Sequence, residues 1–479
     1  MTKVRVVETV SAPTMAALRA ARDESRASLV EVCLDEVNDL DVKGAVEGRK
    51  TPVIVSCRPT WAGGKFSGSE EERLRLLRLA VDAGAEFVEI EGGAERRGLR
   101  GTGHSQIVLS VHSDDGIPGD LAQRVLSLRN ETLAPIKITV KASTLRDCLS
   151  LKDAVQNIGP HTTGATDRPG ALTRLCPWFF GSSWAYGGRA EPSAISAQDL
   201  LDLYRVEDRS NATAIYGIVG MPLGHSASPS MHNRGFHALG LDAVYLPIES
   251  DDPNEFLAVA DALGLAGCSV TVPMKSQIGA RVPSDERSRR IGAVNTLRRL
   301  NGTWEGRNFD AAGFIAPLES RRFPLQGARA VVLGAGGAAR AVVWALTESG
   351  ARVEVCARRP DRARSVAIEF NADVGMWPPR GGWDLLVNAT PVGMAPDVEQ
   401  SPLDRRLVDG RCVYDLIYNP LETRLLSWAR AEGIEVIDGL EMLVSQAVHQ
   451  FEWWTNRAAP RALFREAAEE YIARSPAAH

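Results

Sequence analysis

Short apolar runs and amphipathic stretches alternate along the first two hundred residues. The apolar runs are rich in Val and Ile, recur about every 20–25 residues, and are separated by segments such as 70–83 with a helical pattern of apolar positions. This alternation predicts repeated βα units with parallel strands, whose natural closure is a (β/α)8 barrel of the TIM type. We expect strands at Val4–Val10, Leu29–Leu34, Pro52–Cys57, Glu86–Ile90, Ile107–Val111 and Ile136–Val140.

The last two strands of such a barrel are less clear. Ser183–Tyr186 is a weak strand candidate, and Gly159–Asp167, where the seventh strand would fall, consists mostly of Gly, Thr and other polar residues. A stretch of this kind is too polar for a buried parallel strand. We therefore expect the barrel to be distorted or incomplete near strand 7.

A short polar segment, Glu207–Thr213, separates this region from a new apolar run, Ala214–Val219. Such a change marks a domain boundary, and we place the first domain at residues 1–207. Further along, Trp383–Asn388 and Gly433–Asp438 predict strands of another α/β domain.

A glycine-rich turn follows the apolar run Val331–Leu333. Gly334 allows a tight turn, Gly336 lets the backbone approach a pyrophosphate, and Ala339 lets the next helix pack closely on its strand. The helix N-terminus can then face phosphate groups. The turn is a candidate dinucleotide site, with an ordinary tight βα turn as the alternative; its residues are Gly334, Ala335, Gly336, Gly337 and Ala338.

The end of the next predicted strand bears on the choice of dinucleotide. Arg352–Cys356 runs into Ala357, Arg358 and Arg359, about 20 residues past the first glycine. An NAD enzyme usually has an Asp or Glu here, bound to the ribose hydroxyls. Two arginines without an acid suit a 2′-phosphate and predict NADP; a solvated loop is the alternative.

The composition fits an ordinary protein of two to four domains. The chain has 479 residues and a formal net charge of −5, which favours neither nucleic acid nor a membrane as a partner. Its seven cysteines are scattered without a C-x-x-C pair, which is typical of core thiols in a reducing compartment. Because the sequence also lacks a signal-type stretch and a long apolar run, we expect a cytoplasmic protein, and no metal site.

Chemistry in a barrel collects at the C-terminal ends of the strands. Lys137 lies within the apolar strand 136–140, where a charged lysine is costly to bury. It is expected either to form a structural ion pair with an acid or to act as a low-pKa amine that forms a Schiff base with a ketone, with His112 transferring protons. The other polar residues at strand ends are Glu31, Asp35, Arg58, Glu89, Glu91 and Lys141.

Ordered motifs within residues 1–205 resemble those of the Schiff-base (type I) 3-dehydroquinate dehydratases. They are Glu31-Val-Cys-Leu-Asp35, Ser56-Cys-Arg58, Gly63-Gly64, Ser110-Val-His112, Lys137-Ile-Thr-Val, Thr173-Arg174, Phe180-Gly-Ser182 and Gln198. The resemblance implies a (β/α)8 barrel in which Lys137 forms an imine with the substrate and His112 moves the protons of dehydration. It also implies substrate contacts by Glu31, Arg58, Arg174 and Gln198.

Three departures from that family leave a second interpretation of the barrel open. Cys33 stands where the family has an arginine, Ala62 replaces the glutamate of its Glu-Gly-Gly, and Ala194 begins the segment that replaces its Ser-Ala-Pro-Gly-Gln. The first change removes a charge-assisted bond to an anionic substrate, and the second removes a partner for the histidine. The barrel is therefore either an active dehydratase or a non-catalytic structural or dimerisation module.

Polar residues also follow the predicted strands of the second half. Ser226 and Ser228 flank a turn before a helical stretch, where their hydroxyls either cap that helix or bind a polyhydroxylated small molecule. Lys275 and Asp310 come after predicted strands. They form either an acid/base pair, in which the lysine donates to an oxygen that becomes an alcohol, or a surface salt bridge.

Eight ordered motifs within residues 214–460 resemble those of the shikimate dehydrogenases. They are Ser226-Ala-Ser228-Pro229, Thr271-Val-Pro-Met-Lys275, Ala293-Val-Asn295-Thr296, Asn308-Phe-Asp310-Ala-Ala-Gly313, the glycine turn, Asn388-Ala-Thr390-Pro391-Val-Gly393-Met394, Tyr414-Asp415-Leu-Ile-Tyr418-Asn-Pro420 and Gly439-Leu-Glu-Met442-Leu-Val-Ser-Gln446. The resemblance implies Lys275 and Asp310 as the catalytic pair. It implies substrate binding by Ser226, Ser228, Thr271, Asn295, Tyr418 and Gln446, and cofactor binding by the glycine turn, Arg358, Asn388, Thr390 and Gly439.

Together the two resemblances predict a fusion of enzymes for consecutive steps, dehydration of 3-dehydroquinate and NADPH-dependent reduction of the 3-dehydroshikimate formed to shikimate. We expect a substrate-binding domain at residues 214–313, completed by helices of residues 440–479, and a Rossmann NADP-binding domain at 314–439. These small molecules are the expected partners, and a homodimer is the expected assembly. An NAD-linked quinate dehydrogenase is the remaining alternative, which Arg358 opposes.

Overall fold

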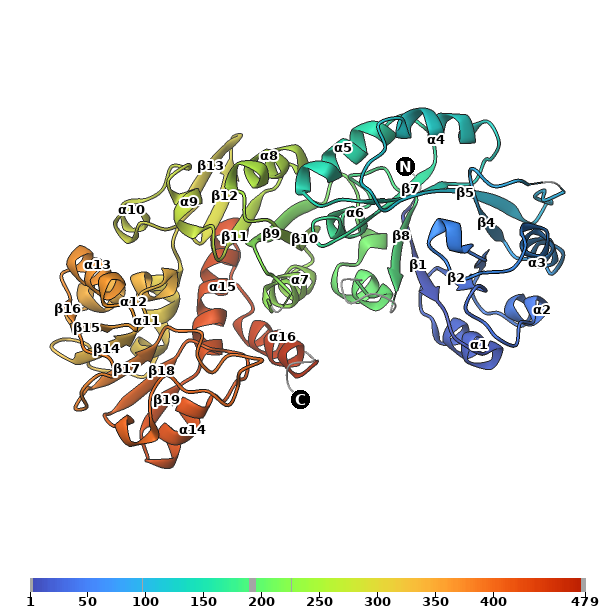
Figure 1. The fold of residues 1–479 in the computed structure, drawn as a ribbon. Coiled ribbons are helices and arrows are strands. Elements are labelled where there is room, and N and C mark those ends of the chain that lie inside the picture. The colour runs from blue at the N-terminus through green and yellow to red at the C-terminus, as the bar shows by residue number, and fades with distance from the viewer. Residues whose placement is uncertain (1–2, 97, 189–194, 225, 475–479) are drawn as a thin grey trace. The chain divides into compact units, whose positions relative to one another are not determined.

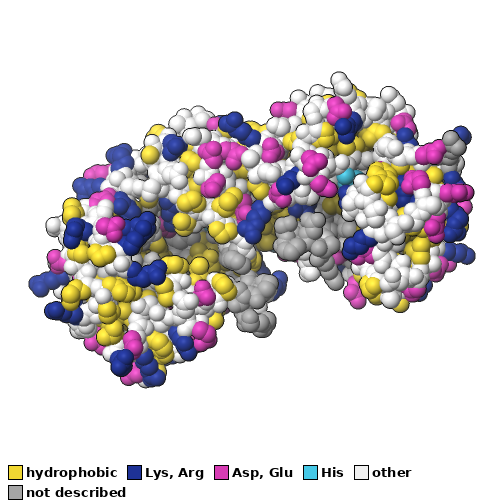
Figure 2. Space-filling view, viewed as in Figure 1, with side chains coloured by type: hydrophobic (Ala, Val, Ile, Leu, Met, Phe, Trp, Pro, Cys, Tyr) yellow, Lys and Arg dark blue, Asp and Glu magenta, His cyan; other side chains and the backbone are white. Residues whose placement is uncertain are grey.

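The computed structural model describes residues 3–96, 98–188, 195–224 and 226–474. The chain forms two compact units: residues 1–213 with 248–250 and 254–263, and residues 214–247, 251–253 and 264–479. Basic and acidic side chains are interspersed over the surface that Figure 2 shows. None of the described helices is both long enough and apolar enough to cross a membrane.

The first unit contains eight strands in the order β7-β6-β5-β4-β3-β2-β1-β8 (Figure 1). All seven neighbouring pairs in this order are parallel. The strands are β1 Arg5–Val10, β2 Leu29–Cys33, β3 Val53–Ser56, β4 Phe87–Glu91, β5 Gln106–Ser113, β6 Ile136–Lys141, β7 His161–Thr166 and β8 Trp184–Gly188. The helices are α1 Met15–Glu24, α2 Val42–Val46, α3 Glu70–Asp82, α4 Leu121–Arg129, α5 Leu145–Val155 and α6 Ala171–Leu175, with short turns η1 Thr60–Ala62, η2 Asp199–Leu203 and η3 Val206–Asp208. The predicted (β/α)8 barrel is thus confirmed, and it is not fully closed between β7 and β8, in line with the distortion expected near strand 7.

Local sequence explains why these elements form. In α3, Ser69 accepts a hydrogen bond from the backbone of Glu72, and three glutamates occupy the first turn, where the helix dipole favours negative charge. Its buried face includes Leu74, Leu77 and Val81. The barrel interior is filled at one level by apolar side chains of several strands, namely Val7, Leu29, Ile54, Val108 and Trp184.

The polar stretch that we judged unsuited to a strand does form β7, so that expectation was wrong. Strand β7 pairs with β6 over six residues, but it meets the chain before β8 only at the bridge between His161 and Ser182. Hydroxyls complete this seam: Thr162 accepts from the backbone of Trp184 at 3.2 Å, and Thr163 bonds the Ser182 hydroxyl at 2.8 Å. The threonines are therefore satisfied although they are buried, which is the condition for burying polar groups.

The second half of the chain contains two sheets. A five-stranded sheet has the order β10-β9-β11-β12-β13, and a six-stranded parallel sheet has the order β16-β15-β14-β17-β18-β19. The strands are β9 Ala214–Gly220, β10 Ala243–Glu249, β11 Gly267–Val270, β12 Thr296–Leu300, β13 Thr303–Arg307, β14 Arg329–Leu333, β15 Arg352–Cys356, β16 Asp373–Val374, β17 Leu385–Asn388, β18 Cys412–Asp415 and β19 Glu435–Ile437. The second order is 3-2-1-4-5-6 of a Rossmann sheet, which binds dinucleotides where the order reverses, here between β14 and β17.

Helices cover these sheets, and the last long one crosses back from the six-stranded sheet. The helices are α7 Ser228–Ala238, α8 Pro253–Leu263, α9 Lys275–Gly279, α10 Glu286–Ile291, α11 Asp310–Ser320, α12 Gly337–Glu348, α13 Pro360–Phe370, α14 Arg424–Ala431, α15 Gly439–Thr455 and α16 Arg461–Arg474, with a turn η4 Arg405–Leu407. Figure 1 shows α15 beginning near β18 and β19 and running towards β11. Its apolar side chains Val444, Ala447 and Phe451 share a core with Met231 and Phe464, so residues far apart in sequence build one site.

Candidate active sites

A cavity of about 200 Å³ lies at the carboxyl ends of β9 and β11. Parallel strands bring the residues that follow them to one edge of a sheet, and α15 adds residues from the end of the chain. All eight residues assigned from the sequence to substrate binding and catalysis line this cavity: Ser226, Ser228, Thr271, Lys275, Asn295, Asp310, Tyr418 and Gln446.

Lys275 and Asp310 form a close pair in this cavity. The Lys275 Nζ donates to Asp310 Oδ2 at 2.6 Å, and the two side chains are only 18% and 8% exposed. The alternative of a surface salt bridge therefore does not describe them. An ammonium held by a carboxylate at the wall of a cavity can donate a proton to an oxygen that gains negative charge.

Asn295 fixes the position of the Asp310 carboxylate. Its amide donates to Asp310 Oδ1 at 2.8 Å and, at 3.3 Å, to Gln446 Oε1. Its own oxygen accepts from the backbone of Phe309 at 2.8 Å and from the Thr296 hydroxyl at 2.7 Å. Because every member is buried and bonded, the network holds the pair in one geometry.

Gln450 is a lining residue that the sequence analysis missed. Its amide oxygen accepts from Ser269 at 3.0 Å, and its nitrogen donates to Thr296 at 2.9 Å. The signal that could have found it is its position four residues after Gln446, which places both on one face of α15. Gln450 thus supports the floor of the cavity from the same helix.

Ser226 and Ser228 both line the cavity. Ser226 Oγ also accepts from the backbone of Ser228, the first residue of α7, at 3.3 Å, so the capping alternative holds for this oxygen. The alternative that the two hydroxyls bind a small molecule stays a prediction.

The glycine turn has the backbone that a pyrophosphate site requires. Gly334 has φ +112°, and a Cβ there would lie 2.8 Å from the carbonyl oxygen of Ala389, so only glycine fits. Helix α12 begins at Gly337, where a Cβ would lie 4.0 Å from Lys275 Cδ. The turn, the helix N-terminus and Lys275 are thus neighbours, and these residues fit a bound dinucleotide.

The other predicted cofactor residues differ in their exposure and in their contacts. Arg358 is exposed between β15 and α13. Asn388 is fully buried: it donates to Asp415 at 2.9 Å and accepts from the Thr390 backbone at 3.1 Å, so its side chain orders the loop behind the cofactor site. At Gly439 a Cβ would lie 2.3 Å from the carbonyl oxygen of Leu416, which excludes any side chain where α15 begins beside the cavity.

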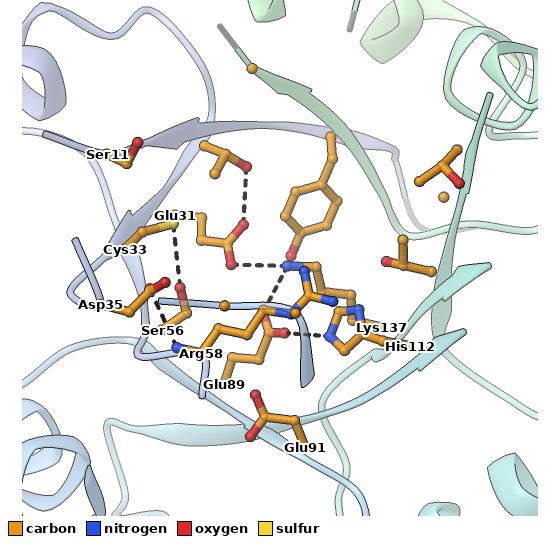
Figure 3. A pocket seen from close by; sticks show the side chains of 18 of the residues that line it. Ser11, Glu31, Cys33, Asp35, Ser56, Arg58, Glu89, Glu91, His112 and Lys137 are labelled. Carbon is orange, nitrogen blue, oxygen red and sulfur yellow. Dashed lines mark hydrogen bonds and ion pairs between the residues drawn. The ribbon is translucent and has the colours of Figure 1, made fainter. Parts of the chain in front are cut away.

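A second cavity, of about 360 Å³, lies at the carboxyl ends of the barrel strands (Figure 3). Lys137 is at its centre and donates to Glu31 Oε1 at 2.9 Å and to Glu89 Oε2 at 2.8 Å. His112 Nε2 lies 3.5 Å from the other oxygen of Glu89. Glu89 therefore joins the lysine and the histidine, which come from the neighbouring strands β6 and β5.

The protonation of Lys137 follows from this pairing. Burial by itself lowers the pKa of Lys137, but Glu31 and Glu89 outweigh burial and raise that pKa well above its ordinary value. Of the two alternatives for Lys137, the ion pair therefore describes the protein without substrate, and the low-pKa amine does not. Burial also raises the pKa of Glu31, against the attraction of Lys137. Glu31 Oε1 accepts from the Lys137 Nζ at 2.9 Å, which makes Glu31 a candidate proton acceptor.

Glu89 lines this cavity. The sequence analysis placed it at a strand end but gave it no role. Burial lowers the pKa of His112, and the nearby Glu89 only partly opposes that effect, so the imidazole is neutral at pH 7 and can accept a proton. The sequence feature that could have pointed to Glu89 is an acid inside an apolar strand, because a carboxylate is costly to bury without a cationic partner. Glu89 gives the histidine a carboxylate although Ala62 has replaced the family's glutamate.

The three departures from the dehydratase motifs have different surroundings. Cys33 accepts from the Ser56 hydroxyl at 3.6 Å, and burial raises the pKa of its thiol well above the ordinary value, so it brings no charge to the cavity. Ala62 lines a neighbouring cavity together with His112. Ala194 lies outside the described residues.

The remaining predicted barrel residues divide into two groups. Arg58 and Arg174 line the cavity, and Figure 3 shows Arg58 pointing towards His112. Gln198 does not line it: its side chain is exposed and donates to Asp202 at 3.2 Å. The local bond to the following turn explains why Gln198 is not brought to the other residues.

Across the described ranges, no cluster of three or more His, Cys, Asp or Glu side chains could hold a metal ion.

Comparison with known families covers both cavities. Residues 6–211 match the type I 3-dehydroquinases. Residues 218–297 match the substrate-binding domain of shikimate dehydrogenase, and residues 439–469 match the C-terminal domain of shikimate 5′-dehydrogenase.

Individual relatives show the same division. The chloroplastic bifunctional 3-dehydroquinate dehydratase/shikimate dehydrogenase of Arabidopsis thaliana is 30% identical in an alignment 489 residues long. The alignment covers 94% of this chain and 81% of that protein. A shikimate dehydrogenase (NADP(+)) of Microcystis aeruginosa is 40% identical over 53% of this chain and 96% of its own length. The crystal structure of shikimate 5-dehydrogenase from Thermus thermophilus in complex with NADP(H) and shikimate matches 54% of this chain and 100% of its own, at 36% identity and a TM-score of 0.51.

Proposed function

Because the chain belongs to the family of bifunctional 3-dehydroquinate dehydratase/shikimate dehydrogenases, we propose that each of its two cavities carries one of these activities. The barrel dehydrates 3-dehydroquinate to 3-dehydroshikimate, and the second unit reduces 3-dehydroshikimate to shikimate with NADPH. The carrying observation is that Lys275 and Asp310 pair at 2.6 Å in a cavity that the predicted substrate residues line.

The division of the second unit is part of this proposal. We assign residues 214–313 and 440–479 to substrate binding and residues 314–439 to the nucleotide. The support is the change from a mixed sheet to a parallel sheet of Rossmann order, together with the packing of α15 on the core that contains Met231 and Phe236.

For the reduction, NADPH supplies the hydride when it is bound at the glycine turn. Lys275 donates a proton to the ketone oxygen, which becomes the hydroxyl of shikimate, and Asp310 holds the lysine in place. Ser226, Ser228, Thr271, Tyr418 and Gln446 surround the substrate hydroxyls and carboxylate. Asn295 keeps the Asp310 carboxylate turned towards Lys275.

For the dehydration, Glu31 first takes a proton from Lys137, whose amine then attacks the substrate ketone to form an imine. His112 removes a proton from the carbon beside the imine and returns it to the departing hydroxyl, which leaves as water. A second water then hydrolyses the C=N bond, which releases the ketone product and restores the Lys137 amine. Glu89 keeps the histidine and the lysine together, and Arg58 and Arg174 supply positive charge for the substrate carboxylate.

One assay tests both activities. With 3-dehydroquinate as the only organic substrate, NADPH absorbance should fall, as it should with 3-dehydroshikimate. Loss only with 3-dehydroshikimate would show that the barrel is the non-catalytic module that Cys33 and Ala62 leave open. Loss with neither substrate would refute the proposal.

The dinucleotide preference is expected to depend on Arg358. Arg358→Ala should raise the KM for NADPH by roughly 10–100-fold, because hydrogen bonds to charged groups contribute about 1.5–3 kcal/mol, and should leave the KM for NADH nearly unchanged. Arg352→Ala, at the opposite end of β15 and also exposed, is the matched control. Equal effects on both cofactors would show that Arg358 does not contact the 2′-phosphate, and would reopen the NAD-linked quinate dehydrogenase alternative.

Glu89 is expected to be needed for dehydration alone. Glu89→Gln removes the charge that holds Lys137 and His112 and should lower kcat of dehydration roughly 10–100-fold. The kcat of reduction in the same preparation should stay unchanged and serves as the control for folding. A dehydration rate equal to that of the wild type would show that the pairing is structural.

Location and assembly remain predictions. All seven cysteines are free thiols, which supports a reducing compartment and hence the cytoplasm, whereas the Arabidopsis relative is chloroplastic. Cell fractionation tests the location, and light scattering of the purified chain tests the homodimer.

A further inference from the structure

Tyr186, on β8, places a phenol beside Lys137 that neither sequence motif nor mechanism has used. The Lys137 Nζ lies 4.4 Å from the centre of the Tyr186 ring, and both residues line the barrel cavity. The ring is held against Trp184, with 6.4 Å between ring centres and an interplanar angle of 64°. Packing against the apolar core of the barrel, which contains Trp184, therefore fixes the position of the Tyr186 ring.

The hydroxyl of Tyr186 is buried and has no hydrogen-bond partner among the described residues. Neighbouring hydroxyls are engaged: Thr9 donates to Glu31 at 3.0 Å, and Thr162 accepts from the Trp184 backbone at 3.2 Å. A phenylalanine would fill the same space without the cost of an unpartnered buried hydroxyl. Stability alone therefore does not account for a tyrosine here.

Imine formation creates a need for a donor at this place. When the Lys137 amine attacks, a C–N bond forms and the ketone oxygen gains an electron pair. Once Glu31 has taken the proton of Lys137, Glu89 is still an anionic acceptor beside the Nζ and repels an oxygen that gains negative charge there. An uncharged donor on the side of the Tyr186 ring would offset this repulsion.

We propose that the Tyr186 hydroxyl donates a hydrogen bond to the ketone oxygen of the substrate and to the carbinolamine oxygen that follows from it. The step balances without proton loss from the phenol. The ammonium of Lys137 gives up two protons, one of them through Glu31, and the oxygen leaves with both as water while the C=N bond forms. Burial raises the pKa of Tyr186 well above its ordinary value, so the phenol keeps its proton.

This inference rests on the proposed imine chemistry, and Tyr186→Phe in the full chain tests it. Two rates are measured: borohydride trapping of 3-dehydroquinate on Lys137, followed by peptide mass, and kcat of dehydration. Both should fall by roughly 10²–10³-fold, as for other single donors to a developing oxyanion. The thermal midpoint of the variant should be unchanged or higher, since the buried hydroxyl is removed.

The matched control is Tyr414→Phe. Tyr414 is also buried, has a hydroxyl without a partner among the described residues, and stacks on Phe314 at 4.9 Å, but it lies in the other unit. It should leave trapping and dehydration at wild-type rates.

Three outcomes would overturn the inference, and they are distinguishable. Trapping by Tyr186→Phe at the wild-type rate removes the role of the hydroxyl. Slower trapping together with a lowered thermal midpoint assigns Tyr186 to packing. If the wild-type chain forms no imine at all, the proposed dehydratase activity fails, and the inference fails with it.

Discussion

Lys275→Ala is expected to lower kcat for reduction of 3-dehydroshikimate by roughly 10²–10⁴-fold, the usual contribution of a positioned general acid. The KM for 3-dehydroshikimate and the Kd for NADPH should change little, because we assign the binding of these molecules to other residues of the cavity and to the glycine turn. Steady-state kinetics and fluorescence titration with NADPH measure these quantities separately. A loss confined to kcat identifies an interaction made in the transition state.

The sequence itself supports an amine at this position. Lys275 is the only lysine in residues 214–479, a region otherwise rich in arginine. Arginine keeps its proton in proteins, whereas lysine can release one. A region that uses arginine for its other cationic side chains but lysine at residue 275 is consistent with proton donation there.

Lys275→Arg separates proton donation from charge. It preserves the positive charge opposite Asp310 but should remain at least about 100-fold slower than the wild type, because a guanidinium does not release its proton. Dehydration of 3-dehydroquinate in the barrel should be unaffected by either variant and serves as the internal control. If Lys275→Ala reduced its substrate at the wild-type rate, the assignment of the acid would be wrong.

Motif position explains why most of the second site could be predicted. Ser226 and Thr271 follow neighbouring strands of one sheet, β9 and β11, and the ends of parallel strands meet at one edge, so their order along the chain sets their place in the fold. Gln446 returns on a helix whose start was marked by Gly439. Gln450 was missed because its partners, Ser269 and Thr296, come from strands remote in sequence.

In the barrel, sequence patterns could not predict features that depend on contacts between residues far apart in the chain. Strand β7 was wrongly judged too polar. Its hydroxyls bond with Ser182 and the backbone of Trp184, and the local sequence pattern does not show these partners. The charge of Lys137 depends on two acids from other strands, Glu31 and Glu89. A pattern that places one lysine in an apolar strand indicates a partner but cannot say how many there are.

Lys137→Ala is expected to abolish dehydration and to leave reduction of 3-dehydroshikimate at the wild-type rate. Without the amine no imine forms, and the barrel loses covalent catalysis entirely. In the coupled assay, 3-dehydroquinate should then cause no NADPH loss, while 3-dehydroshikimate should still do so. Borohydride with 3-dehydroquinate should label the wild-type chain at residue 137 and should leave the variant unlabelled.

Lys141→Ala is the matched control for this variant. Lys141 lies four residues further along β6, is 45% exposed, and forms an ion pair with Asp167 at 4.0 Å. Unlike Lys137, it has neither His112 beside it nor the pair of acids Glu31 and Glu89. Label at residue 141 together with residual dehydration in Lys137→Ala would contradict the assignment, because it would move the imine out of the cavity that Glu31 and Glu89 define.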